Sequence, residues 1–178
     1  MSPGFGRRVG RQIGVRARFL VFACLSAAAP LCAQERVLEL GGGETLRYRL
    51  ITAASESALE TATRLLRHLA EGDLAAAAAL SNAPERRYAV LRDYRDSVGQ
   101  EEFKRVFARY LAPENRLLAE AAIGSRRLLI WNLAEAGNHL AGQYYVQVGE
   151  RFLLDDVPNE ERSKLGRVLA AYRNDAAR

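Results

Sequence analysis

The hydrophobic pattern of this chain changes at Pro113, and that change limits the folds open to it. Before Pro113, apolar residues recur at steps of three and four, which is typical of amphipathic helices. After it, apolar and polar residues alternate in four consecutive segments separated by turn-type residues, which predicts an antiparallel meander. The sequence therefore predicts an α+β fold in which a helical segment precedes a sheet.

Four helices are predicted ahead of Pro113. The first follows Ser57-x-x-Glu60, which matches a capping box, and Gly72 ends it. Asp73 is a candidate cap for a second, alanine-rich helix, and Pro84 suits the first turn of a third. The fourth runs from about Phe103 and stops before Pro113.

The strand pattern gives the remaining elements. A hairpin is predicted at the N-terminal side, with strands Arg36–Leu40 and Thr45–Thr52 joined by three glycines. The meander strands are predicted at Arg116–Ile123, Arg126–Leu133, His139–Val148 and Arg151–Val157. Because Arg126–Leu133 is apolar on both faces, we expect it to be central and covered on both sides. Pro158-Asn159 opens a final helix.

The N-terminal segment differs in composition from the rest. Met1–Arg18 carries five arginines and no acidic residue, and Phe19–Ala33 is apolar. A basic segment, a short apolar core and small residues are typical of a secretory signal. We therefore predict that residues 1–33 are a cleavable signal peptide, that 34–178 form a single α+β domain, and that the protein is periplasmic or secreted. An uncleaved anchor, a transit peptide and lipidation at Cys24 or Cys32 are the alternatives.

Charge and cysteine content narrow the function classes. Five of the 26 basic residues lie before Phe19, so the remaining 21 balance the 21 acidic residues. Without a basic excess the mature domain lacks the electrostatic support that nucleic-acid binding needs. Both cysteines lie in the leader, which excludes a disulfide framework or a thiolate metal site downstream. No metal site and no cofactor is predicted, and no membrane span is expected after cleavage.

The order of elements resembles one known superfamily. Several helices followed by the segments RRLLIWNL, HLAGQYYVQV and ERFLLDDV resemble the nuclear transport factor 2-like (cone-fold) superfamily over roughly Ser55 to Val157. That superfamily includes ketosteroid-isomerase-like enzymes and exported accessory domains. The resemblance implies a curved sheet packed on helices with a cleft between them. No catalytic residue of the family matches a position here, and the hairpin and last helix depart from the pattern.

Residues that could carry catalysis are few. His68 lies beside the apolar stripe of a helix, and His139 begins a strand. A structural role suits both, because a metal site needs three or four converging ligands. No G-x-S-x-G motif is present. Asp155 and Asp156 are adjacent on a strand and point to opposite faces, so they cannot share a proton. No catalytic residue is predicted.

The last hairpin gives the most specific prediction. Gly149-Glu150 suits a two-residue turn, which places Val148 opposite Arg151 and Tyr144 opposite Asp155. The strand face with Tyr144 and Asp155 is the more apolar, so we expect it to pack against the helices. A carboxylate buried there needs water, a hydroxyl or an arginine. Asp155 is therefore either half of a structural ion pair or a polar anchor at a cleft.

These observations predict an exported binding or accessory module without enzymatic activity. Its expected ligand is a partner protein of the envelope or a small apolar molecule, bound between helices and sheet. The candidate ligand-binding residues are Asp155, Tyr144 and Trp131. Two alternatives remain open: a cone-fold isomerase or hydrolase, and a structural subunit of an envelope complex that docks through the hairpin or the last helix.

Overall fold

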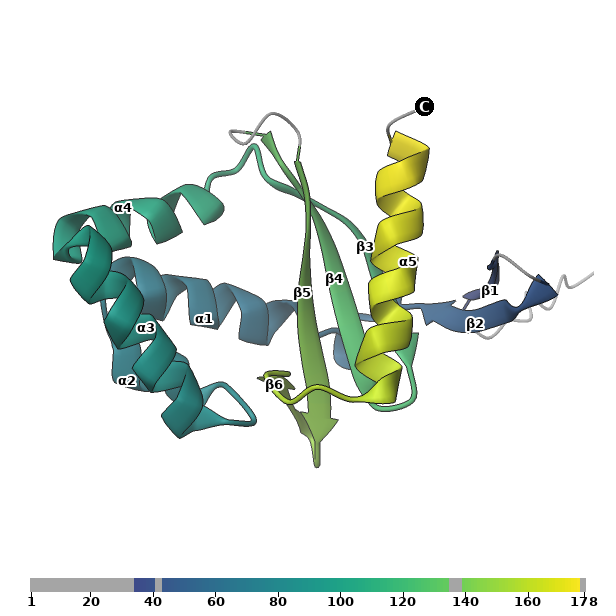
Figure 1. Cartoon of the computed structure of the whole chain (residues 1–178), viewed down its shortest axis with the longest axis horizontal. Helices are drawn as coiled ribbons and strands as arrows, with labels where there is room; N and C mark the ends of the chain where they lie inside the picture. The colour runs from purple at the N-terminus through teal and green to yellow at the C-terminus, as the bar shows by residue number, and fades with distance from the viewer. Residues whose placement is uncertain (1–33, 41–42, 135–138, 177–178) are drawn as a thin grey trace, which may run out of the picture. The chain divides into compact units, whose positions relative to one another are not determined.

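The structure is a computed structural model that describes residues 34–40, 43–134 and 139–176 (Figure 1). The predicted signal segment, Gly41, Gly42 and the predicted turn at residues 135–138 lie outside the described residues. The described residues all belong to one compact unit.

The fold is α+β, with five α-helices and six strands in the described residues. The strands are β1 (Gln34–Glu39), β2 (Thr45–Leu50), β3 (Arg116–Ile123), β4 (Arg126–Leu133), β5 (His139–Val148) and β6 (Arg151–Leu154). The helices are α1 (Leu59–Glu71), α2 (Leu74–Ala79), α3 (Pro84–Val98), α4 (Gln100–Tyr110) and α5 (Glu160–Ala176). All neighbouring strands pair antiparallel, in the order β1 to β6. The predicted meander is β3–β6.

Helices α1–α4 pack on one another through a shared apolar core. Leu65, Leu69, Leu91 and Phe103 are buried in it. The predicted end of α1 and the predicted starts of α2 and α3 are confirmed. Gly72 closes α1 with a φ of +82°, a conformation that glycine adopts without strain, and the Asp73 side chain caps α2 through the Ala76 N–H. Pro84 is the first residue of α3.

The start of α1 differs from the prediction. In the described residues no reciprocal capping box forms between Ser57 and Glu60. Instead, the buried carboxylate of Glu120, on β3, accepts the Ala58 N–H at 2.8 Å and the Ser57 hydroxyl at 2.5 Å. A capping box uses only local residues, whereas here the cap comes from a strand 62 residues further along the chain.

Strand β4 is covered on both faces, as predicted. Leu128 and Ile130 pack against α5, and Leu129 packs against Ala58 and Ala62 at the start of α1. All three β4 side chains are fully buried. The sheet therefore separates two layers, with α5 on one face and α1 on the other.

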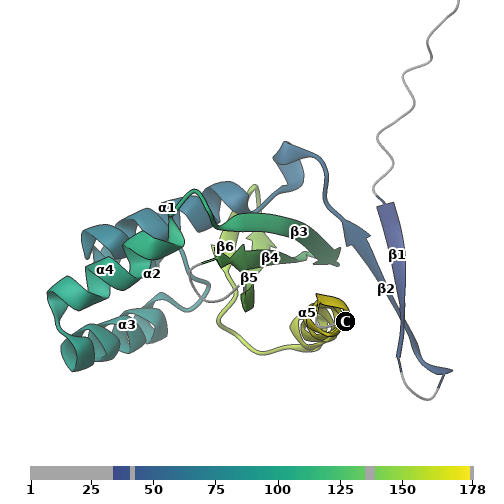
Figure 2. The same ribbon diagram turned by 90° about the horizontal axis from the view of Figure 1, so that it is seen from above.

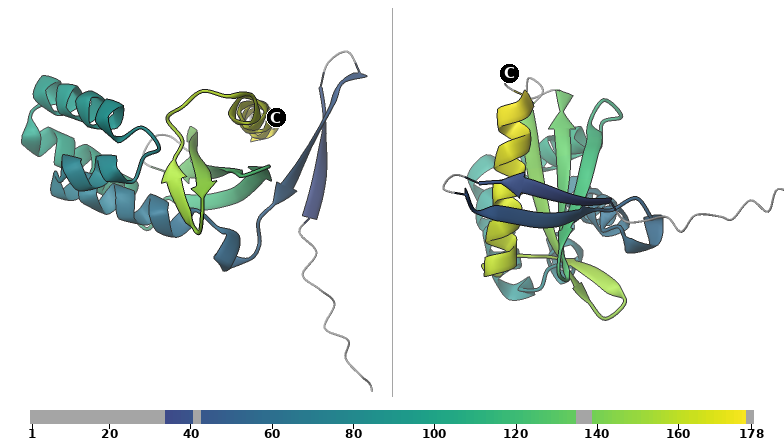
Figure 3. Two further views of the ribbon diagram at one scale, coloured as in Figure 1. Left: turned by 90° about the horizontal axis from the view of Figure 1, so that it is seen from below. Right: turned by 90° about the vertical axis from the view of Figure 1, so that its right-hand side faces the viewer.

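The N-terminal hairpin belongs to the same sheet and covers α5. Strand β2 meets β3 through two residue pairs, Arg49–Ala122 and Leu50–Ala121. Leu46 of β2 lies in one core cluster with Leu165 and Val168 of α5. Figure 2 shows α5 between the hairpin and β3–β5, and the right-hand view of Figure 3 shows the hairpin crossing the direction of those strands. The sheet thus has six strands, not the four of the predicted meander alone.

The predicted register of the last hairpin is confirmed. Val148 opposes Arg151 and Val146 opposes Leu153. The Asp155 N–H donates to the Tyr144 carbonyl at 2.8 Å, which continues the same register. Two details differ from the prediction. Strand β6 ends at Leu154, where its outer edge bonds to the α2–α3 loop: the Leu154 N–H donates to the Leu80 carbonyl and the Leu154 carbonyl accepts the Asn82 N–H.

The second difference concerns which face meets the helices. We expected the face with Tyr144 to be the helix-covered one, because it is the more apolar. Tyr144 does pack in the core cluster of α5. However, the other face carries the fully buried Tyr145 together with Phe152, packed against the start of α1. Ranking the two faces by side-chain polarity was misleading, because the tyrosine at position 145 counts as polar and yet is fully buried.

Candidate functional site

A cavity of about 460 Å³ lies between the helices and the edge of β5. Its volume falls within the roughly 300–1,000 Å³ that is usual for small-molecule sites. Most of its walls are apolar. The apolar lining residues from the helices and sheet are Leu65, Leu66, Leu69, Leu91, Phe107, Tyr110, Leu133, Ala141, Gly142, Tyr144 and Leu154.

The course of α1 and the shortness of β6 explain why the cavity exists. Ala58, just before α1, and Ala62, in its first turn, pack on the sheet, whereas Leu65 and Leu69, one and two turns later, face the cavity. Figure 1 shows α1 running away from the sheet. Strand β6 pairs with β5 only from Tyr145 to Val148, so the first half of β5 forms the sheet edge. Side chains from both faces of β5 therefore reach the cavity.

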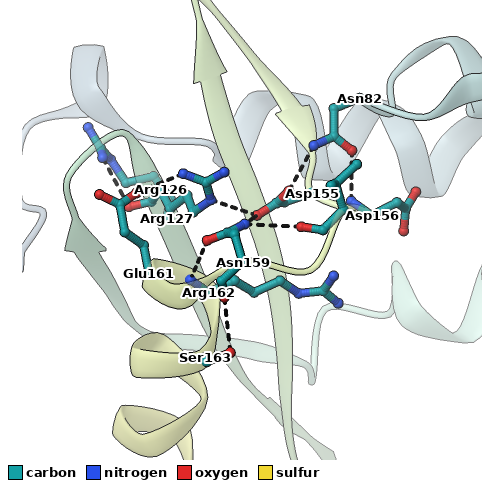
Figure 4. Close-up of polar contacts among 10 residues, drawn as sticks. Asn82, Arg126, Arg127, Asp155, Asp156, Asn159, Glu161, Arg162 and Ser163 are labelled. Carbon is teal, nitrogen blue, oxygen red and sulfur yellow. Dashed lines mark hydrogen bonds and ion pairs between the residues drawn. The ribbon is translucent and has the colours of Figure 1, made fainter.

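Asp155 lies at the polar end of this cavity, with its side chain fully buried. Its oxygen Oδ2 accepts from Arg126 Nε at 3.1 Å and from Asn159 Nδ2 at 3.3 Å. Its oxygen Oδ1 accepts from Asn82 Nδ2 at 2.8 Å (Figure 4). The predicted arginine partner is thus present. Burial of a carboxylate is compensated here by one ion pair and two amide hydrogen bonds.

Asp156 is held in the same manner on the opposite side of the chain. Its carboxylate pairs with the Arg87 guanidinium through two contacts and accepts the Ser81 hydroxyl at 2.6 Å. Asn82 connects the two aspartates, because its Oδ1 accepts the Asp156 N–H at 2.8 Å while its Nδ2 donates to the Asp155 carboxylate. We refer to Ser81, Asn82, Asp155 and Asp156 as the joint, since they tie the α2–α3 loop to the end of β6.

The structure brings two of the three predicted ligand-binding residues together. Asp155 and Tyr144 both line the cavity, and burial raises the pKa of the Tyr144 hydroxyl. Trp131 is not among the described residues that line it. The Trp131 indole N–H donates to Gln143 Oε1 at 3.1 Å. Trp131 therefore contacts a residue that lines the cavity, Gln143. Whether Asp155 anchors a ligand stays a prediction.

Arg162 is a cavity residue that the sequence pattern did not reveal. It comes from the first turns of α5, and its Cζ lies 5.0 Å from the centre of the Tyr144 ring. A guanidinium at this distance over an aromatic face is attracted to it. In the sequence Arg162 looks like any solvated helix residue, and only the fold places it beside Tyr144.

A second buried polar cluster surrounds Glu120, away from the cavity. Burial raises the pKa of the Glu120 carboxyl, while hydrogen bonds from Ser57 and Ala58 and the charge of Arg127 act against that rise. Arg127 is also buried, with its Cζ 5.2 Å from the Phe152 ring centre. Its Nε donates to the Glu56 carbonyl at 3.2 Å. Burial lowers the pKa of this guanidinium, with a further contribution from the charge of Arg49. These contacts fix the start of α1 on the sheet.

The described residues contain no group of three or more His, Cys, Asp or Glu side chains arranged to hold a metal ion. None of their helices is both long enough and apolar enough to cross a membrane. His139 is exposed at the start of β5, where it lies at the border of the cavity.

Comparisons of the chain with protein-family models, with curated proteins and with solved structures gave no match.

Proposed function

We propose that this protein is an exported binding module that holds a small apolar ligand in the cavity between α1, α3, α4 and β5. The observation that carries the proposal is the cavity itself, about 460 Å³ in volume and walled mainly by leucines and aromatic rings. An apolar ligand would displace water from these walls, which is the main favourable contribution to binding at such sites.

The state of the polar groups supports binding rather than catalysis. A general base needs a carboxylate or imidazole that can reach the substrate and take its proton. The oxygens of Asp155 and Asp156 already accept hydrogen bonds from Arg126, Arg87 and Asn82. A cone-fold isomerase or hydrolase is the alternative, and it would require one of these carboxylates to leave its partners.

The hypothesis of a structural envelope subunit has less support. It requires the hairpin or the last helix to offer an apolar face to a neighbour. Leu46 and Tyr48 of the hairpin and Leu165 and Val168 of α5 pack on one another instead. Export itself is proposed from the arginine-rich and apolar segments before Gln34.

A fluorescence titration tests the proposal. The probe is N-phenyl-1-naphthylamine, a neutral apolar dye, added to protein that lacks residues 1–33. We expect saturable binding to the wild type and a loss of at least tenfold in affinity for Ala141→Phe, because the added ring occupies the cavity that Ala141 lines. The matched control is Ala170→Phe, the same change at an exposed position of α5. Equal binding by wild type and Ala141→Phe would refute the proposed site.

A further inference from the structure

The cavity has a polar end, and the arginines there differ in how they are paired. Arg87 is bound to Asp156, and Arg126 is shared between Asp155 and Glu161. Arg162 lines the same end of the cavity and is half-buried. Within the described part of the chain, no carboxylate lies at ion-pair distance from the Arg162 guanidinium, whose one recorded contact is the face of Tyr144.

A second hollow adjoins the cavity at this end. It has a volume of about 330 Å³ and is lined by Arg86, Arg87, Val90, Asp156, Pro158 and Arg162. Three of these residues, Arg87, Asp156 and Arg162, also line the main cavity. Arg86 is exposed on α3 and, like Arg162, has no ion-pair partner among the residues that the structure describes. The apolar cavity thus adjoins a hollow that is lined by three arginines and one aspartate.

The hydrogen-bonding capacity at this end favours an anion over a cation. Both oxygens of Asp155 and both oxygens of Asp156 already accept hydrogen bonds from protein groups. A cationic ligand would have to compete with Arg126 and Arg87 for them. The Arg162 guanidinium, by contrast, keeps its N–H donors available, and a planar fork of donors suits a carboxylate, sulfate or phosphate.

From this arrangement we infer that the ligand is an amphiphile whose single anionic head group binds to Arg162, with Arg86 as a second contact, while its apolar body fills the cavity. The Tyr144 ring positions Arg162 at the border between the apolar walls and the arginine-lined hollow. The inference rests on the proposed function, since it names the class of ligand for the same cavity.

Two matched ligands separate the head group from the body. Decanoate and decanol have the same alkyl chain and differ in charge at neutral pH. Their affinities are measured at pH 7 by displacement of N-phenyl-1-naphthylamine from the protein without residues 1–33. We expect decanoate to bind about tenfold more tightly than decanol to the wild type, the magnitude of one charge-assisted hydrogen bond. This preference should fall as salt is added, because Arg162 is not fully buried.

Variants then assign the preference to a residue. Arg162→Gln should bind decanol as the wild type does and lose most of the preference for decanoate, since only the exposed Arg86 then remains as a contact. Arg162→Lys should keep most of the preference. The control is Arg167→Gln, the same substitution on an exposed face of α5 where the side chain pairs with Glu44. It should bind both ligands as the wild type does, and a melting curve verifies that each variant is folded.

The outcomes distinguish the two proposals. If decanol displaces the dye as well as decanoate does from the wild type, the anionic ligand is refuted while the apolar cavity stands. If Arg162→Gln keeps the full preference of the wild type, the assignment to Arg162 is wrong. If the dye, decanol and decanoate all fail to bind, the proposed function itself fails.

Discussion

The two faces of the sheet are covered by helices in different ways. On one face α5 lies in direct contact with β5, so close that a Cβ added at Gly142 would meet Leu169 Cδ2 at 2.5 Å. On the other face Ala58 and Ala62 at the start of α1 pack on the sheet, and a cavity of about 460 Å³ opens beyond them. Strand β5 thus borders both a tightly packed interior and the cavity. The comparison shows that the cavity depends on how α1–α4 are attached to the sheet. The joint and the start of α1 make that attachment.

The joint gives the largest expected effect. Asp155→Asn keeps the shape of the side chain but removes the charge that Arg126 faces. Loss of one partner of a buried ion pair costs about 3–5 kcal/mol. Because Arg126 retains Glu161, we expect the lower end, about 3 kcal/mol, measured by urea denaturation.

The control for this variant is Asp93→Asn, which removes a carboxylate from an exposed ion pair with Arg92 on α3. Exposed pairs of this kind contribute about 0–1 kcal/mol. If Asp155→Asn cost as little as Asp93→Asn while reducing ligand binding, Asp155 would be an anchor for the ligand and not a structural partner.

The contact between α5 and β5 gives the next effect. Gly142→Ala should lower the free energy of unfolding by about 1–3 kcal/mol, because the new methyl group overlaps Leu169 and Leu128 in a packed interior. The same substitution at Gly166 of α5 should instead stabilise the protein by up to about 1 kcal/mol. There the added Cβ meets Tyr144 Oη at an ordinary 3.7 Å, and alanine favours helix over glycine.

If Gly142→Ala lowers the free energy of unfolding and Gly166→Ala raises it, α5 packs tightly against the sheet with no space left at Gly142. A neutral Gly142→Ala would mean that α5 can move away from β5, and the contrast between the two faces would then be weaker than the structure indicates.

The elements and the last register could be predicted from the sequence because both depend on local patterns. Alternation marks each strand of the meander, and the two-residue turn at Gly149-Glu150 fixes which residues oppose each other. The inward side chain of Asp155 follows from that register, and the cost of burying a charge requires a partner for it, of which an arginine is one of three options.

What could not be predicted depends on contacts between distant segments. Ser57 looks like half of a local capping box, and its hydroxyl does accept the Leu59 N–H at 3.1 Å, yet that hydroxyl donates to Glu120 on β3 and not to Glu60. The hairpin and α5 each look like an appendage with one apolar face, and only the bend at the two β2–β3 residue pairs brings those faces together. Arg162 carries no sequence signal at all, because its role depends on Tyr144 lying next to it.

The smallest effect concerns the attachment of α1 at Glu120. Because burial raises the pKa of Glu120 above the ordinary 4.5, the folded protein binds its proton more readily than the unfolded chain does. Stability from this group is therefore greatest below 4.5 and is lost as the pH rises through the raised pKa. Relative to Glu120→Gln, which does not titrate, the wild type should gain stability as the pH falls through this window.

The measurement is urea denaturation of both proteins across the acidic range, where titrations common to both cancel. The difference in the free energy of unfolding should change by no more than about 1.4 kcal/mol per pH unit, the limit for one proton. A difference that moves in the opposite direction would mean that the hydrogen bonds from Ser57 and Ala58 outweigh burial at Glu120.

The central claim is that the cavity at the edge of β5 binds an apolar ligand, whereas the filled interior between α5 and the sheet does not. Chemical-shift mapping by NMR during titration with N-phenyl-1-naphthylamine tests it most directly. The account predicts saturable shifts at the amides of Leu65, Leu69 and Ala141, which line or border the cavity, and none at Val168 or Tyr172 of α5. Shifts confined to α5 and the hairpin, or no saturable shift at all, would contradict it.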